Sequence, residues 1–181
     1  MCMDPKPKTP KENKVTVLGL GGSGGKIVHH IAENSNDYNL LYVDSDETSL
    51  LESTVRTVKN TNNGQTDFVS IIQELKDTEK LIITTGLGGE FGTFSSYMIY
   101  KMLKTENIQN IELVITMPAK FEGKKRRKLA QEALELLNTN NVDYTLINFD
   151  NLIETLDKKI RLCDCFSIMD EVVYQKIRKE R

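Results

Sequence analysis

Several classes of protein are excluded by what this sequence lacks. Tryptophan is absent, aromatic residues make up only 7%, and the three cysteines are Cys2, Cys163 and Cys165. An odd and badly spaced set of cysteines does not suit a disulfide framework, so we expect free thiols in a reducing compartment. No apolar run approaches the roughly 18 residues of a membrane-spanning helix, and the N-terminus lacks the apolar core of a signal peptide. We therefore expect a cytoplasmic protein.

The charge balance excludes further partners. Lysine and arginine number 24 against 26 aspartate and glutamate residues, which gives a net charge of −2. Without a basic excess, neither nucleic acid nor an anionic membrane is an expected partner. A length of 181 residues with 39% apolar residues suits one globular domain. We expect residues 1–13, which are rich in proline and lysine, to form a disordered tail, and residues 14–181 to form that domain.

Short apolar runs alternate with helical patterns along the chain. The predicted strands are 15–20, 40–44, 81–85, 111–116 and 142–148. The predicted helices include 68–76, 93–105, 122–137, 150–157 and 160–178. Each strand is a continuous apolar run rather than an alternating one, which indicates a sheet covered on both faces. The expected fold class is α/β, with a doubly wound, mostly parallel, Rossmann-like sheet.

Two glycine-rich segments follow strands of this sheet. In the first glycine turn, residues 19–26, glycine lets backbone N–H groups approach an anion, and the helix N-terminus behind the turn favours phosphate. The alternative is a tight strand-to-helix turn without a ligand. The turn is not a P-loop, because its Gly-Lys pair is followed by isoleucine. The predicted phosphate-binding residues are Gly21, Gly22, Ser23 and Gly24.

The second glycine turn, residues 86–93, follows the strand 81–85. Two such turns suit a nucleotide tail that is held from both sides, although a second structural turn is the alternative. Glu90 is unexpected here, because a carboxylate beside phosphates is unfavourable unless a cation or a proton intervenes. The residues predicted to contact phosphate from this side are Gly88, Gly89, Gly92 and Thr93.

The charged residues Asp44, Asp46 and 124–128 have open interpretations. Asp44 lies about 20 residues beyond the first glycine turn, where a dinucleotide fold places its ribose-binding acid, or it is a strand-end turn residue. Asp46 is a second ligand candidate or a helix cap. The five cations at 124–128 oppose the dipole of the helix 122–137, so either an anion lies nearby or this is a solvated basic face.

We expect neither a metal site nor a catalytic residue. Adjacent His29 and His30 point apart on one helix, and Cys163 and Cys165 cannot share a helical face. No Ser–His–Asp pattern or pair of carboxylates stands out from the sequence.

In this order and over residues 14–178, these segments resemble the nucleotide-binding, GTPase domain of the tubulin/FtsZ family. VLGLGGSGGK resembles the family's first phosphate loop, Asp44-Ser45-Asp46 its Asn-Thr-Asp, and TTGLGGEFGTF its signature loop, normally GGGTGTG. TMPAKFEGKKRRKLAQEAL closely resembles an FtsZ segment, and Phe166 with Asp170 matches a pair on the family's core helix.

The resemblance implies a set of roles. Glu122 and Arg126 would contact the ribose and the phosphates. Phe166 would stack on guanine, and Asp170 would accept hydrogen bonds from its N1–H and N2–H₂ groups; their i, i+4 spacing puts both on one helix face. The implied ligand is GTP or GDP, with Mg²⁺ as an accompanying ion.

The sequence also departs from the family pattern. The signature loop has Glu90 and Phe94 where glycines are expected and Phe91 in place of threonine. The region between Leu51 and Leu81 is shorter than in FtsZ, so the loop that senses the γ-phosphate is missing or reduced to 60–66. The family's asparagine after its sixth strand has no clean match.

The family's synergy loop, with its catalytic acid, and its C-terminal domain would follow the last helix, where this sequence stops. We therefore expect a divergent, single-domain relative with weak intrinsic GTP hydrolysis. It would form or regulate filaments through protein–protein contacts, either by self-association or with a tubulin/FtsZ-like partner, and cell division is the implied setting. The alternatives are an NAD(P)-binding oxidoreductase that uses Asp44, or a degenerate interaction module that binds no nucleotide.

Overall fold

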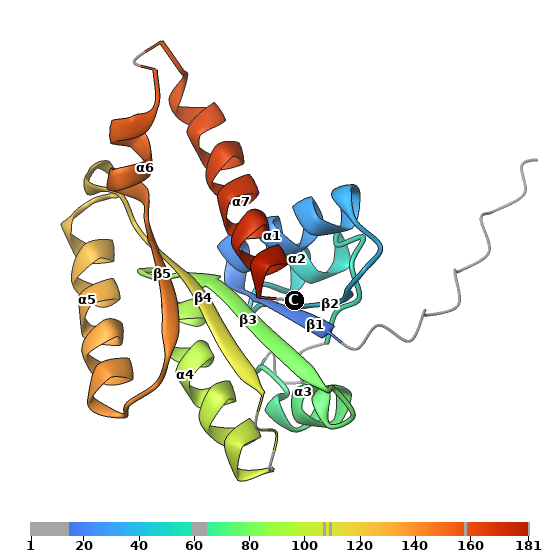
Figure 1. Cartoon of the computed structure of the whole chain (residues 1–181). Helices are drawn as coiled ribbons and strands as arrows, with labels where there is room; N and C mark the ends of the chain where they lie inside the picture. Colours follow the sequence, from blue (N-terminus) through green and yellow to red (C-terminus); the bar gives the residue numbers. More distant parts are fainter. Residues whose placement is uncertain (1–14, 59–64, 107, 109, 158, 181) are drawn as a thin grey trace, which may run out of the picture.

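A five-stranded sheet organises the chain (Figure 1). The computed structural model describes residues 15–58, 65–106, 108, 110–157 and 159–180; the predicted tail, Cys2 and most of 60–66 lie outside them. The strands are β1 (Val15–Leu20), β2 (Asn39–Val43), β3 (Lys80–Gly86), β4 (Ile111–Met117) and β5 (Tyr144–Asn148). The helices are α1 (Gly21–Asn34), α2 (Glu47–Leu51), α3 (Phe68–Leu75), α4 (Glu90–Thr105), α5 (Lys124–Thr139), α6 (Phe149–Thr155) and α7 (Leu162–Lys179), with a short 3₁₀ turn η1 (Lys120–Glu122) before α5.

All neighbouring strands of the sheet are parallel. Their order is β2-β1-β3-β4-β5, and β1, an inner strand, pairs with β2 on one side and with β3 on the other along its length. Its side chains are buried from end to end, which explains why the sequence shows a continuous apolar run. The predicted α/β, doubly wound, parallel fold is confirmed.

Helices cover both faces of the sheet (Figure 1). One apolar cluster joins the sheet to α3, α4 and α5 through residues such as Ile71, Ile99 and Leu134. The other joins it to α1 and α7 through residues such as Ile31 and Val173. The chain therefore leaves β1 toward one face and leaves β3 toward the other. Adjacent strands whose connections diverge in this way open a crevice at their carboxyl ends, where α/β proteins bind ligands.

Most predicted elements are present to within about three residues, and α4 shows where the prediction failed. The helix begins at Glu90 instead of residue 93. We expect from the sequence that Met98 belongs to its buried stripe, but Met98 is 49% exposed. The buried face consists of the small residues Gly92, Thr93, Ser95 and Ser96 with Ile99 and Leu103. Small residues let α4 lie close to the sheet, and an apolar pattern alone does not reveal such a face.

None of the helices in the described parts of the chain is long and apolar enough to cross a membrane.

Candidate functional site

A cavity of about 420 Å³ opens at the carboxyl ends of the strands. Its walls come from the first glycine turn, the second glycine turn, the loop between β4 and α5, and the N-terminal half of α7. Most of the predicted site residues line this one cavity: Gly21, Gly22, Ser23, Asp44, Gly89, Gly92, Glu122, Arg126, Phe166 and Asp170. Segments about 150 residues apart in sequence therefore meet where the fold predicts a ligand.

Four predicted residues, Gly24, Asp46, Gly88 and Thr93, do not line the cavity and have structural contacts instead. A Cβ on Gly24 would lie 2.6 Å from the carbonyl oxygen of Thr84, so this glycine lets α1 approach β3. Asp46 caps α2 and accepts hydrogen bonds from the Thr48 and Ser49 amides at 3.3 and 3.2 Å.

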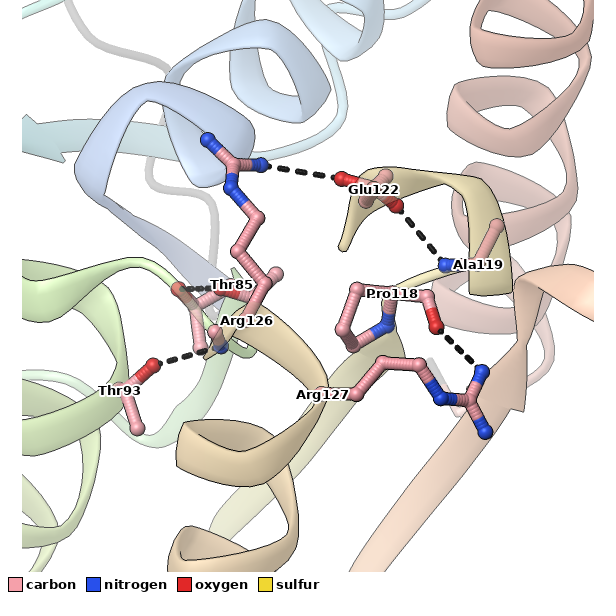
Figure 2. A network of polar contacts seen from close by, with 9 residues as sticks. Thr85, Thr93, Pro118, Ala119, Glu122, Arg126 and Arg127 are labelled. Carbon is pink, nitrogen blue, oxygen red and sulfur yellow. Dashed lines mark hydrogen bonds and ion pairs between the residues drawn. The ribbon is translucent and has the colours of Figure 1, made fainter. Parts of the chain in front are cut away.

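Gly88 and Thr93 brace the second glycine turn. Gly88 has a φ of +90°, a conformation that favours glycine. Its N–H donates to the Thr93 hydroxyl at 2.9 Å. In Figure 2 this hydrogen bond is the dashed line that ends at Thr93. The Thr85 hydroxyl donates to the carbonyl of Leu20 at 2.8 Å and so ties the end of β3, just before the second glycine turn, to the first glycine turn (Figure 2). The two turns are held at a fixed separation around the cavity.

The anion end of the cavity, defined here as Gly21–Ser23 with Gly89–Gly92, is built from main chain. Gly22 and Gly89 line the cavity, and an added Cβ would meet nothing within 4 Å at either position. Helices α1 and α4 both begin here, and neither has a side-chain hydrogen bond at its N-cap. The first N–H groups of a helix have no partner within the helix, and they attract anions. Two helix N-termini that lack capping side chains therefore border one cavity.

The loop between β4 and α5 places Arg126 at the cavity wall (Figure 2). Glu122 accepts a hydrogen bond from the Ala119 N–H at 2.9 Å and pairs with the Arg126 guanidinium at 3.0 Å. Arg127 donates to the Pro118 carbonyl at 3.2 Å and to Asp150 at 2.7 Å. These bonds fix the conformation of the loop. Through them Arg126 and Arg127, two of the five cations at the start of α5, are paired with carboxylates within the protein.

Glu90 also has a cation nearby. Its carboxylate lies 3.8 Å from the Lys125 ammonium, and both side chains are largely exposed. Helix α5 therefore places a positive charge beside the one carboxylate of the second glycine turn.

The base end of the cavity, defined here as Lys26, Phe166 and Asp170, is built from side chains. Phe166 is 36% exposed and makes edge-to-face contacts with Phe121 and Phe149, at centroid distances of 6.2 and 5.0 Å. Asp170 lies one helical turn further along α7. Packed aromatic neighbours fix the ring, which suits it as a stacking surface.

Asp170 is the strongly perturbed carboxyl group of the cavity. Burial raises its pKa to about 6, although the charges of His30 and Lys26 act in the opposite direction. Among the described residues it has no hydrogen-bond or ion-pair partner. A partly buried carboxylate without a donor is a candidate for ligand recognition.

Asp44 lies at the cavity edge and already has partners. It accepts hydrogen bonds from the Tyr42 hydroxyl at 2.8 Å and from the Asp46 N–H at 3.1 Å. Burial, and then the bond to Asp44, raise the pKa of Tyr42, so the phenol stays protonated and keeps donating. These contacts orient Asp44 and reduce its capacity to accept from a ribose.

Lys26 and Phe149 are among the cavity residues that were not predicted from the sequence. Lys26 follows Gly22 by one helical turn, so the helical spacing could have indicated that it faces the same side. Phe149 directly follows β5 and therefore lies at the sheet edge where the other site residues gather.

Comparisons with known proteins identify relatives of this chain in sequence and in fold. No family model matches the chain. The cell division protein FtsZ of Azotobacter vinelandii is 29% identical over 93% of this chain and 48% of its own length. The FtsZ of Coxiella burnetii is 30% identical over 91% and 47%, and the mitochondrial division protein fszB of Dictyostelium discoideum is 29% identical over 91% and 50%. The chain spans about half the length of the curated relatives it matches.

Solved structures show the same fold. An empty FtsZ dimer from M. jannaschii matches with a TM-score of 0.77 at 24% identity, over 90% of this chain and 52% of that one. A GTPγS-bound CetZ2 protofilament from Haloferax volcanii matches with a TM-score of 0.76 at 16% identity, over 90% and 56%. The resemblance of this chain to the nucleotide-binding domain of the tubulin/FtsZ family is therefore confirmed in sequence and in fold.

Proposed function

We propose that this chain binds a guanine nucleotide in the cavity at the carboxyl ends of β1, β3 and β4. The observation that carries the proposal is that one cavity has anion-binding groups at one end and base-binding groups at the other. Main-chain donors of two helix N-termini lie at one end, and an aromatic ring with an unpartnered carboxylate lies at the other. A nucleotide has this polarity, with an anionic tail and a flat base.

At the anion end, the N–H groups of Gly21, Gly22 and Ser23 would face those of Gly89 and Gly92 across the phosphates. Arg126 would add a positive charge to the phosphates or the ribose. Within the described residues no cluster of His, Cys, Asp and Glu could hold a metal ion on its own. This is compatible with Mg²⁺, which is commonly held by substrate phosphates and water.

At the base end, an ionised Asp170 would accept hydrogen bonds from two neighbouring donors. Guanine presents the N1–H and N2–H₂ groups side by side, whereas adenine presents an unprotonated N1, which cannot donate. A site built around an acceptor-only carboxylate thus favours guanine over adenine.

We further propose that the chain forms or regulates filaments, with weak hydrolysis of its own. Relatives over this region are named as division proteins, and two similar structures are protofilaments. Of the cavity carboxylates among the described residues, Asp44 and Glu122 are engaged in hydrogen bonds and Asp170 lies at the base end. Glu90, the fourth, lies beside Lys125. This arrangement leaves no strong base to activate water.

Calorimetric titration with GTP, GDP, ATP and NADH tests the binding proposal. We expect guanine nucleotides to bind and the Asp170→Asn variant to lose most of the preference over ATP. Asp164→Asn is a matched control on the same helix, because Asp164 pairs with Arg161 and does not line the cavity. Binding of NADH alone would favour the oxidoreductase, and binding of none of the four would favour an interaction module.

Co-sedimentation with GTP, alone and with a full-length FtsZ, tests the filament proposal, and phosphate release is measured in the same samples. A chain that neither pellets nor changes the pelleting of FtsZ would contradict a role in filaments. Rapid phosphate release by the chain alone would contradict weak hydrolysis.

A further inference from the structure

The two edge strands of the sheet, β2 and β5, differ in how they are covered. The outer side of β2 pairs with the segment 56–58, because the Tyr42 N–H donates to the Arg56 carbonyl at 2.8 Å and the Tyr42 carbonyl accepts from the Val58 N–H at 3.4 Å. β5 pairs with β4 on one side, and within the described residues no main-chain hydrogen bond reaches its other side. β5 is therefore an open edge of the sheet (Figure 1).

An open edge presents the N–H and C=O groups of every second residue to another strand. Many proteins guard such an edge with charged residues or proline, but Tyr144–Asn148 contains neither. Leu146, at the middle of the strand, is 39% exposed. Tyr144 and Ile147 pack into the apolar clusters on the two faces of the sheet. The strand is thus held in place on both faces and remains available along its edge.

The two ends of β5 carry opposite charge. Asp143, which is exposed, directly precedes the strand. At the other end the Lys120 N–H donates to Asp150 at 2.8 Å, so Lys120 lies close to where β5 ends. Lys124 begins α5 nearby, and Lys120 and Lys124 are both exposed. Arg127 pairs with Asp150, so positive charge is in excess at this end.

A second copy of the same strand fits this edge. In an antiparallel pair centred on Leu146, Tyr144 of each copy stands opposite Asn148 of the other, and no charged side chains oppose each other along the strand. The two-fold axis also brings Asp143 of each copy to the cationic end of the other copy's β5. An isologous contact repeats every favourable pair twice, so these attractions add.

We propose that the open edge of β5 is a self-association site, where two copies of this chain pair antiparallel and join their sheets into one. The contact closes after two copies, whereas a filament contact has to repeat without closing. It lies along the edge of the sheet and uses none of the residues that line the anion end or the base end. The inference therefore does not rest on the proposed nucleotide function.

Sedimentation velocity of the full chain without nucleotide measures the monomer–dimer equilibrium. We expect the wild type to form dimers at about 100 µM or below. Leu146→Lys places two ammonium groups opposite each other at the two-fold axis and should weaken the dimer about tenfold or more. Leu51→Lys is the matched control, because Leu51 is a 75% exposed leucine on α2, which follows the other edge strand. It should leave the equilibrium unchanged.

Two variants at exposed charges test the symmetry without altering the strand. Asp143→Lys and the double variant Lys120→Glu with Lys124→Glu should each weaken their own dimers about tenfold, because both symmetry-related contacts become repulsive. An equal mixture of the two variants should form a heterodimer about as strong as the wild-type dimer. In that pair every substituted position faces the opposite charge again.

A wild type that stays monomeric at this concentration would overturn the inference. A dimer that tolerates Leu146→Lys as well as Leu51→Lys would also overturn it, since the contact would then lie elsewhere. A mixture that dimerises no better than the separate charge variants would contradict the two-fold arrangement. Absence of nucleotide binding would overturn the proposed function and leave this inference intact.

Discussion

The two ends of the cavity differ in what they are made of. At the anion end most of the residues that line the cavity are glycines, so the main chain of two adjacent turns faces the cavity beside the side chains of Ser23, Glu90 and Phe91. At the base end the groups belong to side chains of α1 and α7, two helices that lie about 140 residues apart in sequence. The first end depends on close packing of backbone, and the second on the placement of charge.

Because of this difference, the two ends reduce the stability of the empty protein for different physical reasons. Glycines of the first glycine turn either allow close packing, as at Gly24, or leave open space at the anion end, as at Gly22. At the base end Asp170 is partly buried without a donor, which disfavours its ionised form. Substitutions at the first end should therefore act through sterics, and those at the second through protonation.

The largest effect is expected where backbone packs on backbone. Gly24→Ala would place a Cβ 2.6 Å from the Thr84 carbonyl oxygen and 2.8 Å from the Gly19 carbonyl carbon. Neither atom can move without shifting a central strand, so we expect a loss of about 3 kcal/mol in the free energy of unfolding. Urea denaturation measures it. A loss below about 0.5 kcal/mol would mean that α1 can slide on the sheet.

A substitution at the base end should raise the free energy of unfolding rather than lower it. The pKa of Asp170 in the folded chain is about 6 against an ordinary 3.8, so folding favours the protonated carboxyl group. The stability of the wild type is therefore at its full value below about pH 4, and part of it is lost as the pH rises through 6 and the buried group ionises. Asp170→Asn removes this decline, and we expect the empty variant to be more stable than the wild type by about 2 kcal/mol at pH 7.5.

Chemical denaturation at pH 3.5 and at pH 7.5 checks this prediction. The gain should disappear at the lower pH, where Asp170 is protonated in both folded and unfolded chains. Asp164→Asn, on the exposed start of α7, should show no such pH-dependent gain. An equal gain at both values would show that the substitution acts through packing.

The two ends also differ in how far the sequence predicts them. The first glycine turn, the second glycine turn and the strands before them are local patterns, so the fold and the location of the anion end follow from short stretches. Gly22 and Gly24 nevertheless look alike in the sequence, although one lines the cavity and the other packs on β3. Only the strand beneath the helix distinguishes them.

The base end required knowledge beyond local pattern. Phe166 and Asp170 were predicted through a family resemblance, because nothing in their neighbourhood marks them. Lys26 was missed, since a lysine on an amphipathic helix is usually solvated. Its significance depends on α7 packing beside α1, a tertiary contact that a one-dimensional pattern does not contain.

A third prediction concerns the loop between β4 and α5, which forms part of the cavity wall. Asp150 accepts hydrogen bonds from the Lys120 N–H at 2.8 Å and from Arg127 at 2.7 Å, and so fastens the β4–α5 loop to α6. Burial alone would raise its pKa, but these bonds and the charges of Arg127 and Lys120 lower it overall. Asp150→Asn should therefore cost about 1 kcal/mol of stability.

The expected pH dependence is opposite to that of Asp170. Because the pKa of Asp150 is lowered, its contribution is present above about pH 4 and is lost as pH falls through the folded pKa. Thermal denaturation of the variant and the wild type at pH 7 and pH 3 measures it. A deficit that persists unchanged at pH 3 would show that the carboxylate charge is not what fastens the loop.

The smallest effect on stability should come from Gly22, and it separates ligand binding from folding most clearly. Gly22→Ala adds a Cβ that meets nothing within 4 Å, at a helical position where glycine is disfavoured relative to alanine. We expect the empty variant to gain about 0.5 kcal/mol, measured by urea denaturation. The same methyl group lies at the cavity wall, so it should weaken binding of GDP in calorimetry by keeping phosphate away from the amides. Greater stability together with weaker binding would mean that glycine is retained here for a ligand. Greater stability with unchanged binding would mean that the first glycine turn is only a turn, and the case for an anion at this end would then rest on the second glycine turn alone.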